Sequence, residues 1–375
     1  MKALVIGGAG STGVPIVEGL LERGYDVAVL NRGVHPIEFS PEVERIYADP
    51  HWRENLQEAM EGRSYDLVMA IYGRLRLIAE VMKGKTSRLI SVGGALAVYK
   101  GWMHITNENP FGVMEESPAP LDEDHYLARA PGVDHFSEQV RLSEDMVMEA
   151  HREGVYNATH FRYPIVYGPR SIGCPEWGII RRVRDGRRQV IVPGGGIALV
   201  SRGYCENVAH GLLLAVDNPT ASAGQIYNIC DEKPIAIREW IKKLCQIMDH
   251  ELEFVEVPFD LLPPGFRNAP TQSIFRFHRV MDVAKIKEQL GYRDVVPVDK
   301  ALEATVDWYM EHPLPPGGEI EQNQGDPFDY EAEDRYINIY KDGSEQIRQA
   351  FLQAPGSKVV WRHPYPHPQK KGDLR

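Results

Sequence analysis

The chain has 375 residues, 43% of them hydrophobic, and its formal net charge is −11 at pH 7. This length can bury one large core or two fused ones, and the acidic balance argues against nucleic acid as a partner. The four cysteines form no Cys-x-x-Cys pair, which indicates a reducing compartment without a structural zinc or a disulfide framework. Glycines interrupt the apolar N-terminus too early for a signal peptide, and no run approaches a membrane span, so we expect a cytoplasmic protein.

The N-terminal half alternates between strand and helix patterns. Residues 2–6 form a short apolar run that ends in glycines, as buried parallel strands do. Residues 12–23 carry apolar side chains at helical spacing, and residues 26–30 predict the next strand, which completes a unit of βαβ length. The same alternation predicts strands at 43–47, 66–70, 88–92 and 158–162, and helices at 54–61, 74–83 and 133–152. The fold class is therefore α/β, with a Rossmann-type doubly wound parallel sheet.

After Gly168 the elements become shorter and Pro and Gly more frequent. We divide the chain into a dinucleotide-binding Rossmann domain (1–168, with strands that return later), a smaller C-terminal α/β substrate-binding lobe (169–311) and an extension (312–375). Helices are expected after Gly168 at 176–185, 205–217, 237–249, 282–290 and 298–310. The extension is polar and Pro-rich apart from residues 330–351. Because disordered tails contain few aromatic residues, the aromatic residues of the extension favour an arm that packs on the body or on a partner subunit rather than a disordered tail.

The most specific motif is the turn Gly7-Gly8-Ala9-Gly10-Ser11-Thr12-Gly13, which lies between the first strand and the first helix. Glycines let the backbone N–H groups approach a pyrophosphate, and the N-terminus of the following helix adds partial positive charge. Because the strand–turn–helix context is present on both sides, we expect a dinucleotide here rather than an ordinary glycine-rich turn.

The spacing Gly7-x-x-Gly10-x-x-Gly13 resembles that of the extended short-chain dehydrogenase/reductase superfamily, the NAD-dependent epimerase/dehydratase group. Further segments resemble its motifs: residues 98–101 its "vYG" stretch, 143–148 its long active-site helix, 161–169 its "lRp..vYGP" signature and 224–229 its "Gq.yni" strand. The resemblance covers roughly residues 1–311. It implies an NAD(P)(H)-dependent enzyme acting on a small molecule, and a homodimer paired through the long helix at 133–152.

The expected cofactor contacts lie at the carboxyl ends of the strands. They are Gly7, Gly10, Ser11, Thr12, Gly13, Asn31, Arg32, Asp49, Ala70, Tyr72, Ser91, Pro164 and Val166. The second strand ends in Asn31-Arg32 without the carboxylate typical of NAD enzymes, and an arginine can clamp a 2′-phosphate, so we favour NADP(H) over NAD(H). Two alternatives stay open: Arg32 only stacks on adenine, and Asp49 is a helix cap rather than an adenine contact.

The resemblance breaks down at the catalytic positions. Family members carry Tyr-x-x-x-Lys on the long helix and a Ser or Thr after the preceding strand, and this set moves a proton to or from the substrate oxygen. Aligning Glu144 with the family's helix glutamate puts Phe136 and Val140 in the Tyr and Lys positions. Gly93, Gly94 and Ala95 occupy the region of the Ser or Thr. We therefore expect Gly93, Gly94, Phe136 and Val140 to line the substrate pocket.

A replacement acid would come from the long Gly- and Pro-rich connection at 93–132 or from the start of the long helix. The candidates are Tyr99, Lys100, His104, His125, Tyr126 and His135. Each has a structural explanation as well, Tyr99 above all as a packing residue. The sequence predicts an atypical NADP(H)-dependent oxidoreductase acting on a carbonyl, alcohol or activated double bond of a small organic substrate. The alternatives are a reaction that needs no strong acid, a nucleotide-sugar epimerase or dehydratase, and a non-enzymatic dinucleotide-binding sensor, scaffold or RNA-associated relative.

Overall fold

The computed structural model describes residues 1–34, 37–99, 102, 117–125, 127, 135–262, 269–270 and 275–354. Its contacts divide the chain into two compact units, Met1–Phe328 and Asp329–Arg375. None of the helices in these ranges combines the length and the hydropathy needed to cross a membrane.

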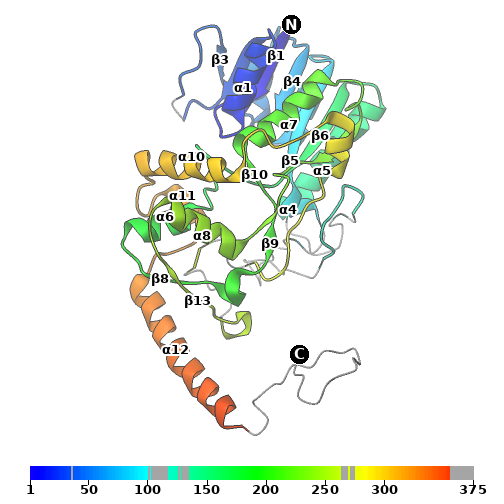
Figure 1. Ribbon diagram of the computed structural model, residues 1–375. Helices are drawn as coiled ribbons and strands as arrows, with labels where there is room; N and C mark the ends of the chain where they lie inside the picture. The colour runs from blue at the N-terminus through cyan, green and yellow to red at the C-terminus, as the bar shows by residue number, and fades with distance from the viewer. Residues whose placement is uncertain are drawn as a thin grey trace, which may run out of the picture. The chain divides into compact units, whose positions relative to one another are not determined.

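A parallel sheet forms the centre of the first unit, with its strands in the order β11-β6-β5-β4-β1-β2-β3 (Figure 1). The strands are β1 (Lys2–Ile6), β2 (Asp26–Asn31), β3 (Glu44–Tyr47), β4 (Leu67–Ala70), β5 (Arg88–Gly94), β6 (Asn157–Tyr163) and β11 (Gln225–Asn228). Each neighbouring pair is parallel. The strand order reverses at β1, which makes a topological switch point at the carboxyl edge. The α/β doubly wound prediction is therefore confirmed.

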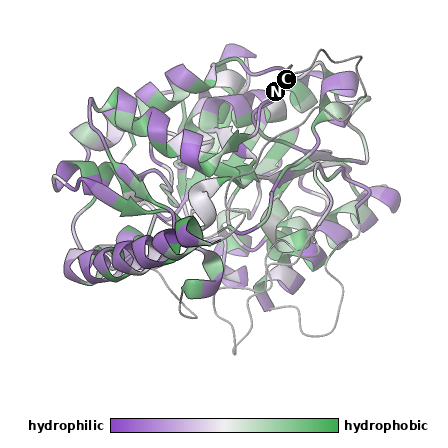
Figure 2. Ribbon diagram, turned by 60° about the horizontal axis from the view of Figure 1, so that its bottom comes forward, coloured by the Kyte–Doolittle hydropathy of each residue, from purple (hydrophilic) through white to green (hydrophobic). Residues whose placement is uncertain are grey.

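Helices cover both faces of this sheet. Ala3 and Val5 belong to one core cluster, together with residues of α1 (Gly13–Glu22), α7 (Cys205–Asp217) and α9 (Ala284–Leu290). Leu4 and Ile6 belong to the other, together with residues of α2 (Arg53–Ala59), α3 (Leu75–Val81) and α5 (His135–Arg152). Because side chains alternate along a strand, a strand buried on both faces reads as one continuous apolar run. In Figure 2 hydrophobic colouring gathers on the strands, while the helices carry both kinds of residue.

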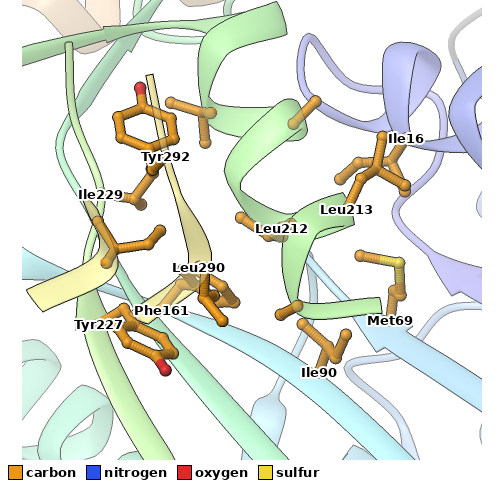
Figure 3. Close-up of a cluster of buried hydrophobic side chains, with 14 of the residues drawn as sticks. Ile16, Met69, Ile90, Phe161, Leu212, Leu213, Tyr227, Ile229, Leu290 and Tyr292 are labelled. Atoms are coloured by element: carbon orange, nitrogen blue, oxygen red, sulfur yellow. The ribbon is translucent and has the colours of Figure 1, made fainter. Parts of the chain in front are cut away.

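The first cluster holds α1 and α7 close together. Figure 3 shows Ile16 of α1 beside Leu213 of α7, with Leu212 facing the sheet residues. The approach is so close that a Cβ on Gly19 would lie 2.3 Å from Leu213 Cδ1. A glycine on α1 thus lets α7 pack over the sheet, which keeps the glycine turn in a rigid frame.

A smaller group of elements packs around a core cluster of its own, whose buried residues run from Tyr167 to Tyr309. The helices α6 (Trp177–Arg184), α8 (Ile237–Ile247) and α10 (Val298–Glu311) share its core cluster. Three short strand pairs complete it: β7 (Ile165–Tyr167) with β10 (Arg202–Tyr204), β8 (Gln189–Ile191) with β13 (Glu253–Val255), and β9 (Leu199–Val200) with β12 (Ile235–Ala236). Single 3-10 turns lie at Pro193–Gly196 and Phe259–Leu261. The predicted helices are all present, but sequence patterns did not reveal these two- and three-residue strands.

The beginning of the C-terminal extension lies within the first unit. The short helix α11 (Glu319–Gln324) contacts α6, where Glu321 Oε1 accepts hydrogen bonds from Trp177 Nε1 at 2.7 Å and Arg181 Nη1 at 2.8 Å. Asp326 pairs with Arg182 at 2.6 Å, and both side chains are buried. In the second unit α12 (Tyr330–Gln353) begins with Asp329, whose side chain accepts a hydrogen bond from the Ala332 backbone.

Candidate active site

The glycine turn after β1 requires glycine at two positions. Gly7 has φ +94°, a conformation that side chains disfavour, and a Cβ there would lie 2.4 Å from Tyr72 Cβ. A Cβ on Gly13 would lie 2.5 Å from the backbone carbon of Gly8, so only glycine allows α1 to start this close to β1. The turn is closed by hydrogen bonds from Gly10 N to Gly7 O at 3.2 Å and from Gly13 N to Gly10 O at 3.1 Å.

Gly10 differs from its neighbours because it borders open space. Among the described residues, the nearest atom to a Cβ built on Gly10 is Gly7 O, at 3.7 Å. The glycine is therefore not needed for packing within the chain, and its bare backbone leaves a cradle in front of the N-terminus of α1. A helix N-terminus with accessible backbone N–H groups fits an anionic pyrophosphate, so the turn fits the dinucleotide that its sequence implies.

The ends of β2 and β4 and the loop after β3 meet beside this turn. Asn31 Oδ1 accepts a hydrogen bond from Gly33 N at 2.8 Å, which shapes the chain reversal after β2. The Arg32 guanidinium lies 5.5 Å from the centre of the Tyr72 ring. Asp49 Oδ1 accepts from His51 N at 3.0 Å and lies 2.8 Å from His51 Nδ1. Residues expected at the adenosine end of a cofactor are thus gathered in one place.

Sequence analysis missed His51 as a member of this group. Its ring contacts Tyr72 edge to face, with centroids 5.1 Å apart. The only sequence signal was its position two residues after Asp49, at the entrance to α2. Burial disfavours the charged form of Asp49, but hydrogen bonds from the His51 backbone and ring outweigh it and lower the pKa of the carboxyl.

The other expected cofactor residues lie at the ends of β4, β5 and β6. Ala70 ends β4 and is buried, while Pro164, between β6 and β7, and Val166 of β7 are half-buried. Ser91 is fully buried on β5, and its hydroxyl lies 2.8 Å from His160 Nδ1 of β6. This internal hydrogen bond weighs against a cofactor contact through the Ser91 hydroxyl. Tyr163, the last residue of β6, lies near the Thr12 side chain of the glycine turn. Sequence analysis did not name it as a site residue.

A buried polar network joins α5 to the end of the sheet. Glu144 accepts two hydrogen bonds from Arg162, at 2.8 and 2.9 Å. Arg162 Nη1 also donates to Tyr99 Oη at 3.0 Å, and Tyr99 donates to Asn228 Oδ1 at 2.6 Å. Burial raises the pKa of Tyr99 to about 12, although the Arg162 charge acts in the opposite direction. Tyr99 is fully buried and its hydroxyl is committed, which weighs against the acid role expected for it.

The four positions expected to line a substrate pocket are in different environments. Phe136, in the first turn of α5, is 61% exposed, which weighs against its forming the wall of a closed pocket. Val140 lies beside Gly93, where a Cβ would be 3.4 Å from Val140 Cγ1 and only 2.8 Å from His160 Nε2. A Cβ on Gly94 would meet no described atom within 4 Å. Among the described residues, the end of β5 thus leaves open space beside Gly94.

Two of the remaining candidates for the catalytic acid lie among the described residues. His135 is exposed at the first residue of α5, and the His125 ring lies 6.1 Å from the Tyr99 ring. Lys100, His104 and Tyr126 lie outside the described residues. Within the described ranges, no group of three or more His, Cys, Asp or Glu side chains is placed to hold a metal ion.

Comparisons with known proteins agree with this geometry. The family model described as "NAD dependent epimerase/dehydratase family" matches residues 103–230. Sterol-4-alpha-carboxylate 3-dehydrogenase, decarboxylating, of Mus musculus is 26% identical over 346 residues, which cover 81% of this chain and 90% of that protein. The structure of UDP-glucose 4-epimerase from Thermotoga maritima with UDP-glucose has a TM-score of 0.64 at 20% identity, covering 83% of this chain and 99% of that chain.

A second solved structure contains the cofactor. UDP-glucuronic acid 4-epimerase from Bacillus cereus in complex with NAD has a TM-score of 0.63 at 19% identity, covering 83% of this chain and 99% of that chain. The sheet order and the open glycine turn define a dinucleotide-binding protein of the Rossmann class. More narrowly, residues 103–230 match the model of the NAD-dependent epimerase/dehydratase family, and the mouse sterol dehydrogenase is similar along most of the chain.

Proposed function

We propose that this protein is an atypical NAD(P)(H)-dependent oxidoreductase that acts on a carbonyl, alcohol or activated double bond of a small organic molecule. The observation that most supports this proposal is the open space at Gly10, in front of α1, where a Cβ would have its nearest described neighbour at 3.7 Å. When bound, a nicotinamide dinucleotide supplies hydride-transfer chemistry. The backbone of the glycine turn holds the pyrophosphate, while Arg32 and Tyr72 hold the adenosine end.

The substrate proposed here is weakly polar. Val140 stands at the position where the family has a cation, and Gly94 opens the end of β5 without adding a polar side chain. Such a surface offers little to a sugar diphosphate and more to an apolar skeleton. The sterol named in the mouse relative is a substrate of this kind.

The activity is tested by following NADPH oxidation with a panel of ketones, aldehydes and enones, and NADP⁺ reduction with sterols, other alcohols and UDP-sugars. Turnover of an apolar carbonyl or alcohol supports the proposal, and turnover of UDP-sugars alone would favour a nucleotide-sugar enzyme. If no substrate reacts while the cofactor binds tightly, the protein is a non-enzymatic dinucleotide binder.

The cradle is tested separately with Gly10→Ala. The new methyl group fits the folded chain but occupies the proposed path of the pyrophosphate, so cofactor affinity should fall at least about tenfold, or about 1.4 kcal/mol. Gly173→Ala is the control, because a Cβ there meets no described atom within 4 Å and the residue lies outside the glycine turn. Equal affinity of both variants would place the cofactor elsewhere.

We also propose that NADP(H) binds at least about tenfold more tightly than NAD(H). Support comes from Arg32, which extends from the end of β2 where NAD enzymes carry a carboxylate. Calorimetric titration of both cofactors tests this, and Arg32→Ala should remove the difference. Equal affinities in the native protein would refute the preference.

A homodimer formed through α5 is the proposed assembly, as the family resemblance implies. Light scattering should then give about twice the 42.4 kDa of a single chain at micromolar concentration. A single-chain mass would refute it.

A further inference from the structure

The loop between β7 and α6, residues 168–176, has a backbone conformation that its side chains disfavour. Arg170 has φ +62° and Cys174 has φ +25°, both in the left-handed region that non-glycine residues rarely enter. The described part of the chain contains only two more such residues, and one of them is Phe328 with φ +49°. Strained backbone persists only where the surrounding structure imposes it, so contacts from elsewhere must hold this loop.

Side chains from far along the chain hold three carbonyl groups of the β7–α6 loop. Gln324 Nε2 donates hydrogen bonds to Gly173 O at 3.0 Å and to Cys174 O at 2.7 Å. Tyr309 Oη of α10 donates to Ser171 O at 3.0 Å. Gln324 and Ser171 are 6% and 4% exposed, so water does not replace these hydrogen bonds easily. The loop is therefore fixed from its C-terminal neighbours in space.

Gln324 belongs to residues 317–328, which we call the strap. The strap is anchored on α6 by the ion pair between Asp326 and Arg182, 2.6 Å apart, with both side chains at most 1% exposed. Removing one partner of such a buried pair is strongly destabilising, so this anchor is firm. The strap also lies beyond residues 1–311, the part of the chain that resembles the family. It is thus an addition to the shared fold that reaches back to one of its loops.

The same loop forms a wall of a cleft that contains part of the glycine turn. Pro169 and Arg170 line this surface cleft of about 550 Å³ together with Ser11. The Arg170 guanidinium lies 4.3 Å from the centre of the Trp308 ring, which fixes its side chain at the cleft. A change in the strained backbone at Arg170 would therefore change the wall that stands beside Ser11.

We propose that the strap positions the cofactor site: Gln324 holds the β7–α6 loop in its strained conformation, and the loop fixes the cleft wall beside Ser11. The inference rests on the proposed dinucleotide site at the glycine turn. A cofactor whose pyrophosphate lies on that turn then meets a wall that is already ordered, so binding costs less conformational entropy. Arg32 and Tyr72, at the adenosine end, do not line this cleft, so that end should not depend on the strap.

The test compares Gln324→Leu with Gln322→Leu. Both remove a glutamine from α11, but Gln322 is exposed and its Nε2 donates only within the strap, to Gly317 O at 2.7 Å. Calorimetry measures the dissociation constants of the preferred cofactor, NADPH or NADH, and of its adenosine half, 2′,5′-ADP or AMP. Gln324→Leu should weaken the whole cofactor about threefold to tenfold and the adenosine half less than about twofold. Gln322→Leu should change neither.

This split separates positioning from a general loss of stability, because a smaller folded fraction would weaken both ligands by the same factor. Amide hydrogen exchange measures the loop itself: peptides from residues 168–176 should exchange at least about tenfold faster in Gln324→Leu, while those of β1 and α1 stay as in the native protein. Tyr309→Phe removes the Ser171 anchor but leaves the strap intact. It should act in the same direction, and it carries the test if Gln324→Leu does not fold.

Three outcomes would each overturn the inference: unchanged exchange of the loop, an equal loss of affinity for cofactor and adenosine half, or native cofactor affinity in a variant whose loop exchanges faster. A native protein that binds neither NADPH nor NADH would refute the proposed dinucleotide site, and this inference with it.

Discussion

The two ends of the site are built on different principles. At the glycine turn the chain exposes backbone: a Cβ on Gly10 would have its nearest neighbour at 3.7 Å, and α1 starts directly behind it. At the end of β5 the chain buries its polar groups: Tyr99, Arg162 and Glu144 bond one another beneath the surface. The glycine turn therefore leaves backbone exposed for a ligand, whereas the polar side chains near the end of β5 hydrogen-bond one another.

Under the proposed function, one half of the sheet edge binds the cofactor through its backbone, while the polar side chains of the other half stabilise the fold. Backbone binding survives almost any change of side chains, provided that the glycines remain. Proton transfer depends on particular side chains reaching a shared point, and Phe136 and Val140 provide no such group. The predictions below test whether the polar groups at the end of β5 and on α5 have a structural role.

The largest effect is expected from Arg162→Met. It leaves the Glu144 carboxylate buried without its bidentate partner, which should cost about 3–5 kcal/mol of unfolding free energy. Urea denaturation measures this loss. Arg53→Met is the matched control, because Arg53 and Glu80 are paired at the surface with both side chains more than 40% exposed, and its cost should be under about 1 kcal/mol. Similar costs for both variants would contradict a structural network.

His160 should make stability depend on pH. Burial lowers the pKa of its imidazole from 6.5 to about 4, although the Glu144 charge favours protonation. The unfolded chain then binds the proton first, so stability is fully present above pH 6.5 and falls as pH decreases towards 4, by up to about 3 kcal/mol. His160→Gln should lack this component when denaturation curves at pH 7.5 and 4.5 are compared. An identical pH dependence of the two proteins would show that His160 titrates normally.

Tyr99→Phe should have a moderate effect on stability and none on cofactor binding. The lost hydroxyl leaves Asn228 and Arg162 with unmet hydrogen bonds, at a cost of about 1–3 kcal/mol. Tyr47→Phe, at a tyrosine that is 65% exposed, should be neutral. If Tyr99 were the catalytic acid instead, turnover of an identified substrate would fall about a hundredfold or more at a temperature where the variant is fully folded.

The smallest effect is expected from Gly94→Ser. The backbone at Gly94 (φ −86°, ψ 117°) suits any residue, and the side chain enters open space, so stability should change by less than about 0.5 kcal/mol. Cofactor affinity should stay within about twofold. A hydroxyl alone should not raise turnover, because the tyrosine and lysine are also missing and such groups act together. A large gain in turnover would mean that the site lacked only this hydroxyl.

Local patterns were sufficient for the cofactor half of the molecule. The apolar run of β1, the glycine spacing and the helical periodicity of α1 are contiguous in sequence, and each follows from backbone geometry or from burial on two faces. The same holds for β11, which a short motif identified and which pairs with β6 in parallel. The signals of β1, the glycine turn and α1 lie within about 30 residues of one another, the span of a βαβ unit, and depend little on distant parts of the chain.

Tertiary structure decided the roles of individual side chains. The sequence left Tyr99 open as an acid while favouring a packing role, and the structure adds that Asn228, 129 positions away, accepts its hydrogen bond. His51 gains significance only because Tyr72, from the end of another strand, brings it towards Arg32. The sequence by itself therefore determined the fold class and predicted the place of the cofactor, since both arise from periodicity and glycine spacing. Which polar groups are buried and which remain available was decided by the three-dimensional structure, because that depends on partners far apart in the chain.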